Sequence, residues 1–358
     1  MRKGKVATEQ TSALQKEFKL ITIKDIARLS GFSVTTVSKA LNNYSDVATS
    51  TKKHIEKICD EVGYIPNAQA QGLVSKKSYT IGIIFEEITG IGLQHPLFSK
   101  ILEAFKNEVE KFGYDIMFLS KSSVLGNHKS YYNHSIRKQV EAILVLCSEF
   151  NSDNMLELYK GSIPIVMIDY NHKSNCNITS NNKSGVKKAV EYLIKLNHKK
   201  IANMHGSPDS SFIGYIRKTY FIESMLENGL EVPKNYLING GSFSKEDGFN
   251  AMNEVLKFKD QPTAIVCASD MLAIGAMQAI KKHGLQVPGD YSIIGFDGID
   301  AGQLISPKLT TIKQDTEMMG KIAASQILKM IKEKQQLSIG ETIEIETSIL
   351  VGETTREI

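Results

Sequence analysis

The sequence predicts a multidomain protein in which an all-α helix-turn-helix head precedes an α/β region of two lobes, each a doubly wound parallel sheet. Three observations support this prediction. Residues 22–62 follow helical spacing, whereas short apolar runs alternate with helical patterns from residue 80 onward. Residues 1–79 contain 13 Lys and Arg against 7 Asp and Glu, while the remainder contains 30 against 32. The basic excess therefore lies in residues 1–79, the segment that we expect to meet nucleic-acid phosphates.

The first 20 residues are polar and mixed in charge, so we expect a flexible leader that adds weak phosphate contacts. They lack the apolar core of a signal peptide, and no apolar run approaches the length of a membrane span. Four cysteines are scattered without a CxxC pair, which is typical of reduced structural thiols. These features predict a cytoplasmic protein that has no contact with a membrane.

Residues 22–42 predict two short helices joined by a tight turn. Thr22 is placed to cap the first helix, and Asp25 completes a capping box three residues later. Gly31 supplies the left-handed conformation of the turn, and Ser33 is placed to cap the second helix. Apolar residues at helical spacing give each helix an inward face: Ile23, Ile26 and Ala27 in the first, and Val37, Ala40 and Leu41 in the second.

A third helix is expected over about residues 51–62, with Ile55, Ile58 and Val62 facing inward. Three short helices with a small shared core suit a compact DNA-binding module. Spacing alone leaves a second interpretation open, a small helical hairpin with a polar surface, because helical pairs are common in proteins.

The outer face of the second helix carries side chains that suit contact with DNA. Short hydroxyls and valine methyls can touch base edges and thymine methyls, and a lysine can donate to guanine acceptors. Other polar side chains suit phosphate contacts, which set the register on the duplex. The outer face comprises Val34, Thr35, Thr36, Ser38 and Lys39, and the candidate backbone contacts are Thr22, Ser33, Thr36, Ser38, Asn42 and Thr51.

Two sets of short apolar runs follow the head. The runs are continuously apolar rather than alternating, which indicates parallel strands buried on both faces. Two sets of such strands imply two doubly wound lobes. The first set lies at 80–85, 115–119, 142–146 and 164–168, and the second at 200–204, 263–268 and 291–296.

Polar side chains directly follow several of these runs. Ligands of such sheets bind beyond the carboxyl ends of the strands, so two facing lobes predict one ligand in the cleft between them. Carboxylates, hydroxyls and a nearby aromatic ring suit a polyhydroxylated ligand. Each polar residue could instead cap a helix; that reading is preferred for Asp270 and stays open for Ser269. The strand-end residues are Ser120, Lys121, Asp169, Tyr170, Ser269, Asp270 and Asp297.

The run TIKDIARLSGFSVTTVSKALN at 22–42 and the run GYIPNAQAQGLVSKKS at 63–78 resemble the opening of the LacI/GalR family of bacterial repressors. The similarity continues almost to the C-terminus. It implies a periplasmic-binding-protein-like effector domain behind the head, and no cofactor. It also implies that Val34, Thr35 and Lys39 are the base-reading positions.

The resemblance further implies a hinge helix at about residues 66–75, within a DNA-binding region that spans 21–79. Two such helices, one from each subunit, would pair in the minor groove. Leu73 would wedge into the central base step, and Ala70 is small enough for close approach; Asn67 completes the candidate hinge contacts. An apolar wedge costs unstacking energy, but the bend brings more protein onto the duplex.

The resemblance also selects effector contacts: Asp169, Arg217, Phe243, Ser269 and Asp297. The family has an Arg, two residues, a Gly and an aromatic residue here, and Tyr220 replaces that glycine in this chain. The other interpretation of Arg217 is a solvated helix arginine. Two further candidates complete the set, Phe98, whose alternative is an ordinary core phenylalanine, and the strand-end residue Ser120.

We expect a homodimer on a pseudo-palindromic operator in double-stranded DNA, with closure of each lobe pair on a small sugar-like effector controlling the hinge. The first lobe is expected at about residues 80–180 and 310–340, and the second at about 181–309 and 341–358. Together these segments form the effector-binding and dimerisation domain, residues 80–358.

Two other classes of protein, and one alternative within the family, compete with this interpretation. A solute-binding protein for transport would need a signal peptide and would have no use for residues 22–78. An enzyme is not expected, because GxxxxGK[ST], HExxH and GxSxG are absent and the eight histidines are dispersed without metal-ligand spacing. A regulator that answers to a phosphorylated partner protein remains an alternative within the family.

Overall fold

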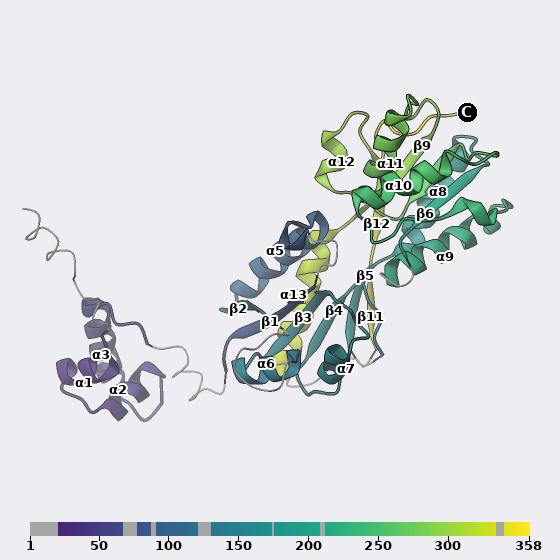
Figure 1. The fold of residues 1–358 in the computed structure, drawn as a ribbon. Coiled ribbons are helices and arrows are strands. Elements are labelled where there is room, and N and C mark those ends of the chain that lie inside the picture. Colours follow the sequence, from purple (N-terminus) through teal and green to yellow (C-terminus); the bar gives the residue numbers. More distant parts are fainter. Residues whose placement is uncertain are drawn as a thin grey trace, which may run out of the picture. The chain divides into compact units, whose positions relative to one another are not determined.

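The computed structural model describes residues 21–66, 77–86, 91–120, 130–173, 175–207, 212–333 and 340–358. The chain divides into two compact units, Met1–Ser78 and Tyr79–Ile358, whose elements are labelled in Figure 1. The expected leader and the hinge candidates Asn67, Ala70 and Leu73 lie outside the described residues. No described helix is both long enough and apolar enough to cross a bilayer.

Residues 21–66, the part of the head that the structure describes, form three helices, and local hydrogen bonds set several of their ends. The Asp25 carboxylate accepts the Thr22 backbone N–H at 3.1 Å and the Thr22 hydroxyl at 2.8 Å. Gly31 has a φ of +75°, as its place in the turn predicts. The Ser33 hydroxyl accepts the Thr36 backbone N–H at 3.1 Å. The helices are α1 (Ile23–Ser30), α2 (Val34–Leu41) and α3 (Thr49–Val62).

A small apolar core holds these three helices together. Its buried members come from each helix in turn: Ile26, Val37, Ala40, Ile55 and Cys59. The third helix begins at Thr49, two residues before the expected start, and the residue before it, Ala48, offers no side-chain cap. Packing of the inward face therefore substitutes for a cap at this end of α3.

The second unit contains two six-stranded sheets. The first sheet has the order β11-β5-β4-β3-β1-β2, and the second has the order β12-β10-β9-β8-β6-β7. Among the described strands, every pairing is parallel except that of β10 with β12. The strands of the first sheet are β1 (Thr80–Phe85), β2 (Asp115–Phe118), β3 (Ala142–Cys147), β4 (Ile165–Ile168), β5 (Cys176–Ser180) and β11 (Thr342–Ile345). Those of the second are β6 (Ile201–His205), β7 (Leu237–Asn239), β8 (Ala264–Cys267), β9 (Ser292–Asp297), β10 (Thr310–Gln314) and β12 (Thr347–Leu350).

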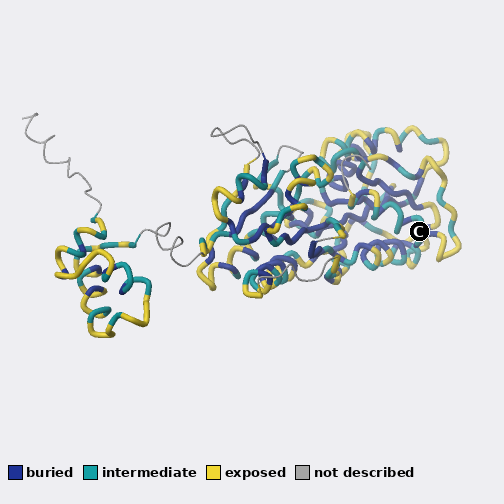
Figure 2. The backbone as a smooth tube through the Cα atoms, turned by 90° about the horizontal axis from the view of Figure 1, so that it is seen from below, coloured by how far each residue is buried: buried dark blue, intermediate teal, exposed yellow. Residues whose placement is uncertain are grey.

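Helices cover both faces of each sheet, which is why the strands read as continuous apolar runs. One face of the first sheet packs against α5 (Pro96–Glu110) and α13 (Thr316–Glu333), and the other against α6 (Tyr131–Lys138) and α7 (Asp153–Tyr159). The second sheet packs against α10 (Lys245–Val255) and α11 (Asp270–Lys282) on one face. Its other face packs against α8 (Asn182–Lys195) and α9 (Phe212–Glu227). Figure 2 shows buried segments running through the interior of this unit and exposed segments at its surface.

The chain crosses between the lobes three times, and two crossings differ from the expected boundaries. Residues 310–314 were assigned to the first lobe, but β10 pairs with β9 in the second sheet. Residues from 341 onward were assigned to the second lobe, but β11 pairs with β5 in the first sheet. A short strand next to a crossing can extend either sheet with the same residues, so its partner is decided by tertiary packing.

Candidate functional site

The outer face of α2 is open to solvent. Val34 and Thr35 are exposed, and Lys39 is partly exposed, while Val37 and Ala40 face the core. The helix therefore presents the three base-reading candidates on its free side. Among the backbone-contact candidates, Thr36, Ser38 and Thr51 are partly exposed.

Three of the backbone-contact candidates also hold the ends of helices. Thr22 bonds to Asp25, Ser33 caps α2, and the Asn42 side-chain amide donates to the Ser38 carbonyl at 2.8 Å. A group that fastens a helix end is held in one orientation, which helps to fix the register of a phosphate contact.

A pocket of about 150 Å³ lies between the two lobes. Its walls include the strand-end carboxylates Asp169 and Asp297, which come from different sheets, and the α9 side chain Arg217. The pocket thus brings together six of the seven effector candidates from distant parts of the chain: Phe98, Asp169, Arg217, Phe243, Ser269 and Asp297.

Ser120 is the candidate that the pocket omits. Among the described residues, those lining the pocket do not include Ser120, whose backbone N–H instead donates to His134 Nδ1 at 3.1 Å. Ser120 follows β2, and β2 is the outermost strand of the first sheet. The strand-end rule finds residues at the correct edge of a sheet, but it does not say which strands stand opposite the second lobe.

Arg217 is the polar centre of the pocket, and only 4% of its side chain is exposed. Its Nε donates to Asn182 Oδ1 at 2.8 Å, and its Nη1 donates to the Ala268 carbonyl at 2.6 Å. Nη1 also lies 3.4 Å from Asp297 Oδ1, and the guanidinium carbon lies 3.6 Å from the centre of the Phe296 ring. The alternative of a solvated helix arginine is therefore wrong.

The two carboxylates are held by neighbouring polar side chains. Asp169 has a φ of +56° and accepts the Thr179 hydroxyl at 3.0 Å. Asp297 accepts the Gln314 amide at 2.7 Å. Burial raises the pKa of Asp169 and lowers the pKa of Arg217, and the attraction between these opposite charges counteracts both shifts.

Asp297 makes the stability of the second unit depend on pH. Burial, opposed by Arg217 and Gln314, raises the pKa of Asp297 from 3.8 to about 6. Between these pH values the folded state binds more protons at this carboxyl than the unfolded state, so raising the pH lowers the free energy of unfolding. The effect of Asp297 ionisation should be absent below about pH 4 and should lower the free energy of unfolding by about 2–3 kcal/mol at pH 7.

The isosteric variant Asp297→Asn isolates this effect, since it removes the titrating proton and keeps an acceptor for Gln314. The variant should gain stability relative to the wild type by about 2–3 kcal/mol between pH 4 and pH 7. Denaturant unfolding of both proteins across this pH range measures the difference. A difference that stays flat across the range would contradict the assigned cause.

Ser269 caps a helix and also lines the pocket, while its contact with an effector stays a prediction. Its hydroxyl accepts the Leu272 backbone N–H at 3.2 Å, which caps α11, and the residue also lines the pocket. The expectation that Asp270 caps the same helix is wrong. Its carboxylate instead accepts the Ile299 backbone N–H at 2.8 Å and the Thr311 hydroxyl at 2.5 Å. Asp270 therefore fastens the loop that follows Asp297.

Aromatic rings form the apolar walls of the pocket. Phe98 packs against the first core and also lines the pocket, while its contact with an effector stays a prediction. Phe150 stacks on Tyr170 with ring centres 4.1 Å apart, and Phe212 meets Tyr170 edge-on at 5.5 Å. Neither Phe150 nor Phe212 directly follows a strand, so the sequence pattern does not indicate them.

The sixth candidate, Phe243, depends on a glycine beside it. A Cβ atom at Gly206 would lie 2.3 Å from the Phe243 ring, a separation that atoms cannot tolerate. Phe243 itself has a φ of +72°, an uncommon conformation for a bulky residue. The local fold therefore accepts backbone strain in order to direct this ring toward the pocket.

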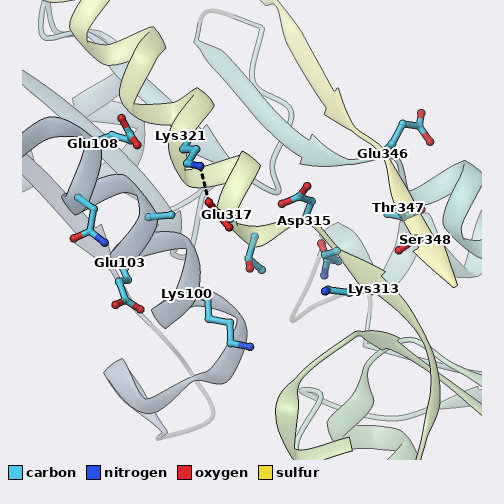
Figure 3. A pocket seen from close by; sticks show the side chains of 14 residues that line it. Lys100, Glu103, Glu108, Lys313, Asp315, Glu317, Lys321, Glu346, Thr347 and Ser348 are labelled. Atoms are coloured by element: carbon cyan, nitrogen blue, oxygen red, sulfur yellow. Dashed lines mark hydrogen bonds and ion pairs between the residues drawn. The ribbon is translucent and has the colours of Figure 1, made fainter. Parts of the chain in front are cut away.

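A larger groove of about 1010 Å³ is a poorer candidate for a ligand site. Figure 3 shows its lining of charged side chains from α5, α13 and β10, together with Glu346 just before β12. Several of these charges are already paired, such as Lys321 with Glu317 at 2.5 Å and Lys100 with Asp300 at 2.8 Å. The small pocket instead holds buried polar groups that converge on one point, which is the usual form of a ligand site.

Two family models match the chain. The model described as "Bacterial regulatory proteins, lacI family" matches residues 22–67. The model described as "Periplasmic binding protein-like domain" matches residues 190–355. The two matches fall on the head and on the second unit respectively.

Two curated relatives extend over most of the chain. A "Probable HTH-type transcriptional repressor ExuR" of Bacillus subtilis (strain 168) is 32% identical over 341 residues, which is 95% of this chain and 99% of the relative. An "HTH-type transcriptional repressor PurR" of Pasteurella multocida (strain Pm70) is 33% identical over 321 residues, which is 88% of this chain and 94% of the relative.

Two solved structures share the fold. The Lac repressor dimer bound to operator and the anti-inducer ONPF has a TM-score of 0.79 and 26% identity, covering 94% of this chain and 100% of that chain. A complex of the transcriptional regulator CelR with cellobiose has a TM-score of 0.68 and 21% identity, covering 93% of this chain and 99% of that chain.

Proposed function

The chain belongs to the lacI family of bacterial regulatory proteins and is a DNA-binding transcriptional repressor, and we propose that a small sugar-like effector in the 150 Å³ pocket controls its affinity for operator DNA. The proposed assembly is a homodimer on a pseudo-palindromic operator. A transport solute-binding protein is excluded, because the family match includes the DNA-binding head.

The observation that carries the effector proposal is the convergence of Arg217, Asp169 and Asp297 in one pocket with aromatic walls. Carboxylates accept hydrogen bonds from hydroxyl groups, and a guanidinium donates to hydroxyl or ring oxygens. Aromatic rings such as Phe243 cover the apolar face of a sugar ring. The Lac repressor and CelR structures were solved with ONPF and cellobiose, which agrees with this class of ligand.

On the DNA side, Val34, Thr35 and Lys39 are the proposed base-reading residues. Their exposure on the free face of α2 supports this role. The polar residues around the same helix would contact phosphates and set the register. The hinge contacts of Asn67, Ala70 and Leu73 stay a prediction, because these residues lie outside the described part of the chain.

Control by the effector requires that it bind one arrangement of the lobes better than another. The pocket is lined by residues of both sheets, so a ligand that fills it changes the free energy of lobe closure. In a dimer, closure would alter the distance between the two hinge segments. Coupling of this type amounts to about 1–3 kcal/mol.

Selection from a random duplex library tests the DNA-binding part of the proposal, referred to below as the DNA arm. The full-length protein should enrich one pseudo-palindromic sequence, and Lys39→Ala should lose about 1–3 kcal/mol of discrimination at the base it reads. The measurement is the affinity of each protein for the enriched duplex and for single-base changes within it. Identical preferences of the two proteins at every position would show that Lys39 reads no base.

Titration with a panel of mono- and disaccharides tests the part of the proposal that concerns control by an effector. One member should change the apparent dissociation constant for the enriched duplex by about 5- to 150-fold. It should also raise the melting temperature of the second unit. If DNA affinity is the same with every sugar, the effector proposal is wrong, whereas the DNA arm is unaffected.

A further inference from the structure

Asp46, a carboxylate in the loop between α2 and α3, holds the proposed base-reading lysine. Lys39 Nζ lies 2.5 Å from Asp46 Oδ2. The two side chains are 42% and 55% exposed, respectively, so the pair is accessible at the surface of the head. Nothing in the sequence pattern marked Asp46, because a separation of seven residues across a turn predicts no contact.

The loop is fastened, which keeps Asp46 next to the helix end. Asn43 has a φ of +57°, and this left-handed residue turns the chain back along α2. The Tyr44 backbone N–H donates to the Lys39 carbonyl at 3.0 Å. Lys52 of α3 donates to the Asn43 side chain at 2.8 Å, and Val47 packs on the core of the head.

Both members of the pair are charged at neutral pH. The hydrogen bond between them raises the pKa of Lys39 and lowers the pKa of Asp46. Residues 21–66 carry six Lys and Arg side chains against five Asp and Glu, a net charge of +1. Over residues 1–79, which include the flanking segments, the net charge is +6, so loss of the Asp46 carboxylate raises the positive charge next to Lys39 by one without changing the sign of the region.

The Lys39–Asp46 pair would affect the affinity for cognate DNA and for non-cognate DNA to different extents. On a cognate site, Lys39 can exchange the carboxylate for guanine acceptors in the major groove. On other sequences the lysine gains no base contact, and the carboxylate is brought toward phosphates of the same sign. Such an element acts by weakening the wrong complex more than the right one.

We propose that Asp46 is a specificity-determining residue, which lowers affinity for non-operator DNA by competing with phosphates for Lys39. The proposal rests on the proposed base-reading role of Lys39. It assigns to Asp46 an effect on discrimination between sequences rather than on the fold of the head.

The test uses the full-length chain with two duplexes, the one enriched by wild-type protein and a shuffled duplex of the same composition. Asp46→Asn should bind the shuffled duplex up to about 15-fold more tightly at 50 mM salt, since one additional lysine–phosphate contact releases about one counterion. Its salt slope on that duplex should steepen by about 0.9. Binding to the enriched duplex should change by less than about threefold, so the specificity ratio falls.

Glu61→Gln is the matched control. Glu61 is a 61% exposed carboxylate of the same unit, and it pairs with Lys57 at 3.7 Å. Its substitution removes the same charge and also frees a lysine, but away from α2. We expect the control to shift both duplexes by less than about twofold. Equal effects of the two variants on the specificity ratio would overturn the proposal in favour of a general charge effect.

A double-mutant cycle with Lys39→Met tests the route of the effect. In that background Asp46→Asn should no longer steepen the salt slope on the shuffled duplex or change the specificity ratio. A change as large as that in the wild-type background would overturn the proposal. Failure of the wild-type protein to enrich any duplex would instead count against the proposed function itself.

Discussion

Arg217→Met is expected to abolish the response to effector while leaving operator binding within about threefold of the wild type. The guanidinium is the buried cation of the pocket and lies between carbonyl, amide and carboxylate acceptors. Its loss removes charge-assisted hydrogen bonds to the ligand that are worth about 1.5–3 kcal/mol each. Two such bonds correspond to a loss of affinity of roughly 100-fold or more.

Methionine is the informative substitution at this position, because it keeps much of the apolar volume against Phe296. The variant leaves Asp169 and Asp297 without their cation, and breaking a buried ion pair costs about 3–5 kcal/mol. This cost should shrink as the pH falls, because burial raises the pKa of both carboxyls and their protonation removes the uncompensated charge. Assays at neutral pH and at a lower pH can therefore separate the loss of stability from the loss of response.

Operator release across an effector titration measures the response. Lys218→Met is the matched control, since Lys218 follows Arg217 on α9 but does not line the pocket. The control should keep the midpoint of the wild-type titration. An unchanged midpoint for Arg217→Met as well would show that the effector binds elsewhere.

Ile26→Ala should remove DNA binding without disturbing the second unit. Ile26 is fully buried in a core that, among the described residues of the head, has five buried apolar members. Truncation of a buried isoleucine to alanine costs about 2–5 kcal/mol, which is most of the stability expected for a domain of this size. The head should therefore be largely unfolded at 37 °C, and operator affinity should fall by roughly 100-fold or more.

The second unit is compact in its own right, so its melting transition and its effector affinity should not change. Calorimetry of the full-length chain should show only the transition of the second unit, with that of the head lost or strongly lowered. Leu29→Ala on the same helix is the control, because Leu29 is 53% exposed and its truncation should cost less than about 0.5 kcal/mol. A variant Ile26→Ala that retains operator affinity would contradict the assignment of the head.

Local chemistry explains the parts of the fold that the sequence predicted well. Thr22 with Asp25, the left-handed Gly31 and the Ser33 cap each depend on residues within four positions of one another. Continuous apolar runs in the sequence also indicate buried parallel strands. Both signals survive in a single sequence, because neither needs knowledge of which segments meet in space.

The cleft was predicted in part for a related reason. The strand-end rule selected Asp169, Ser269 and Asp297, and all three line the pocket. The same rule selected Ser120, which lies after an edge strand away from the pocket. The aromatic walls from Phe150 and Phe212 were missed, since a ring that reaches the cleft from a loop or a helix carries no signal in the strand pattern.

The sequence by itself determined the helix ends of the head, the two-lobed α/β class and the family resemblance, because these depend on spacing between near neighbours. Only the tertiary structure decided which sheet receives β10 and β11, which strand ends face the pocket, and that Asp46 holds Lys39. These features join residues that lie far apart in the sequence or across a turn, and such contacts produce no periodic pattern in the sequence. Local spacing is therefore compatible with several arrangements, and the packing of the whole chain selects one of them.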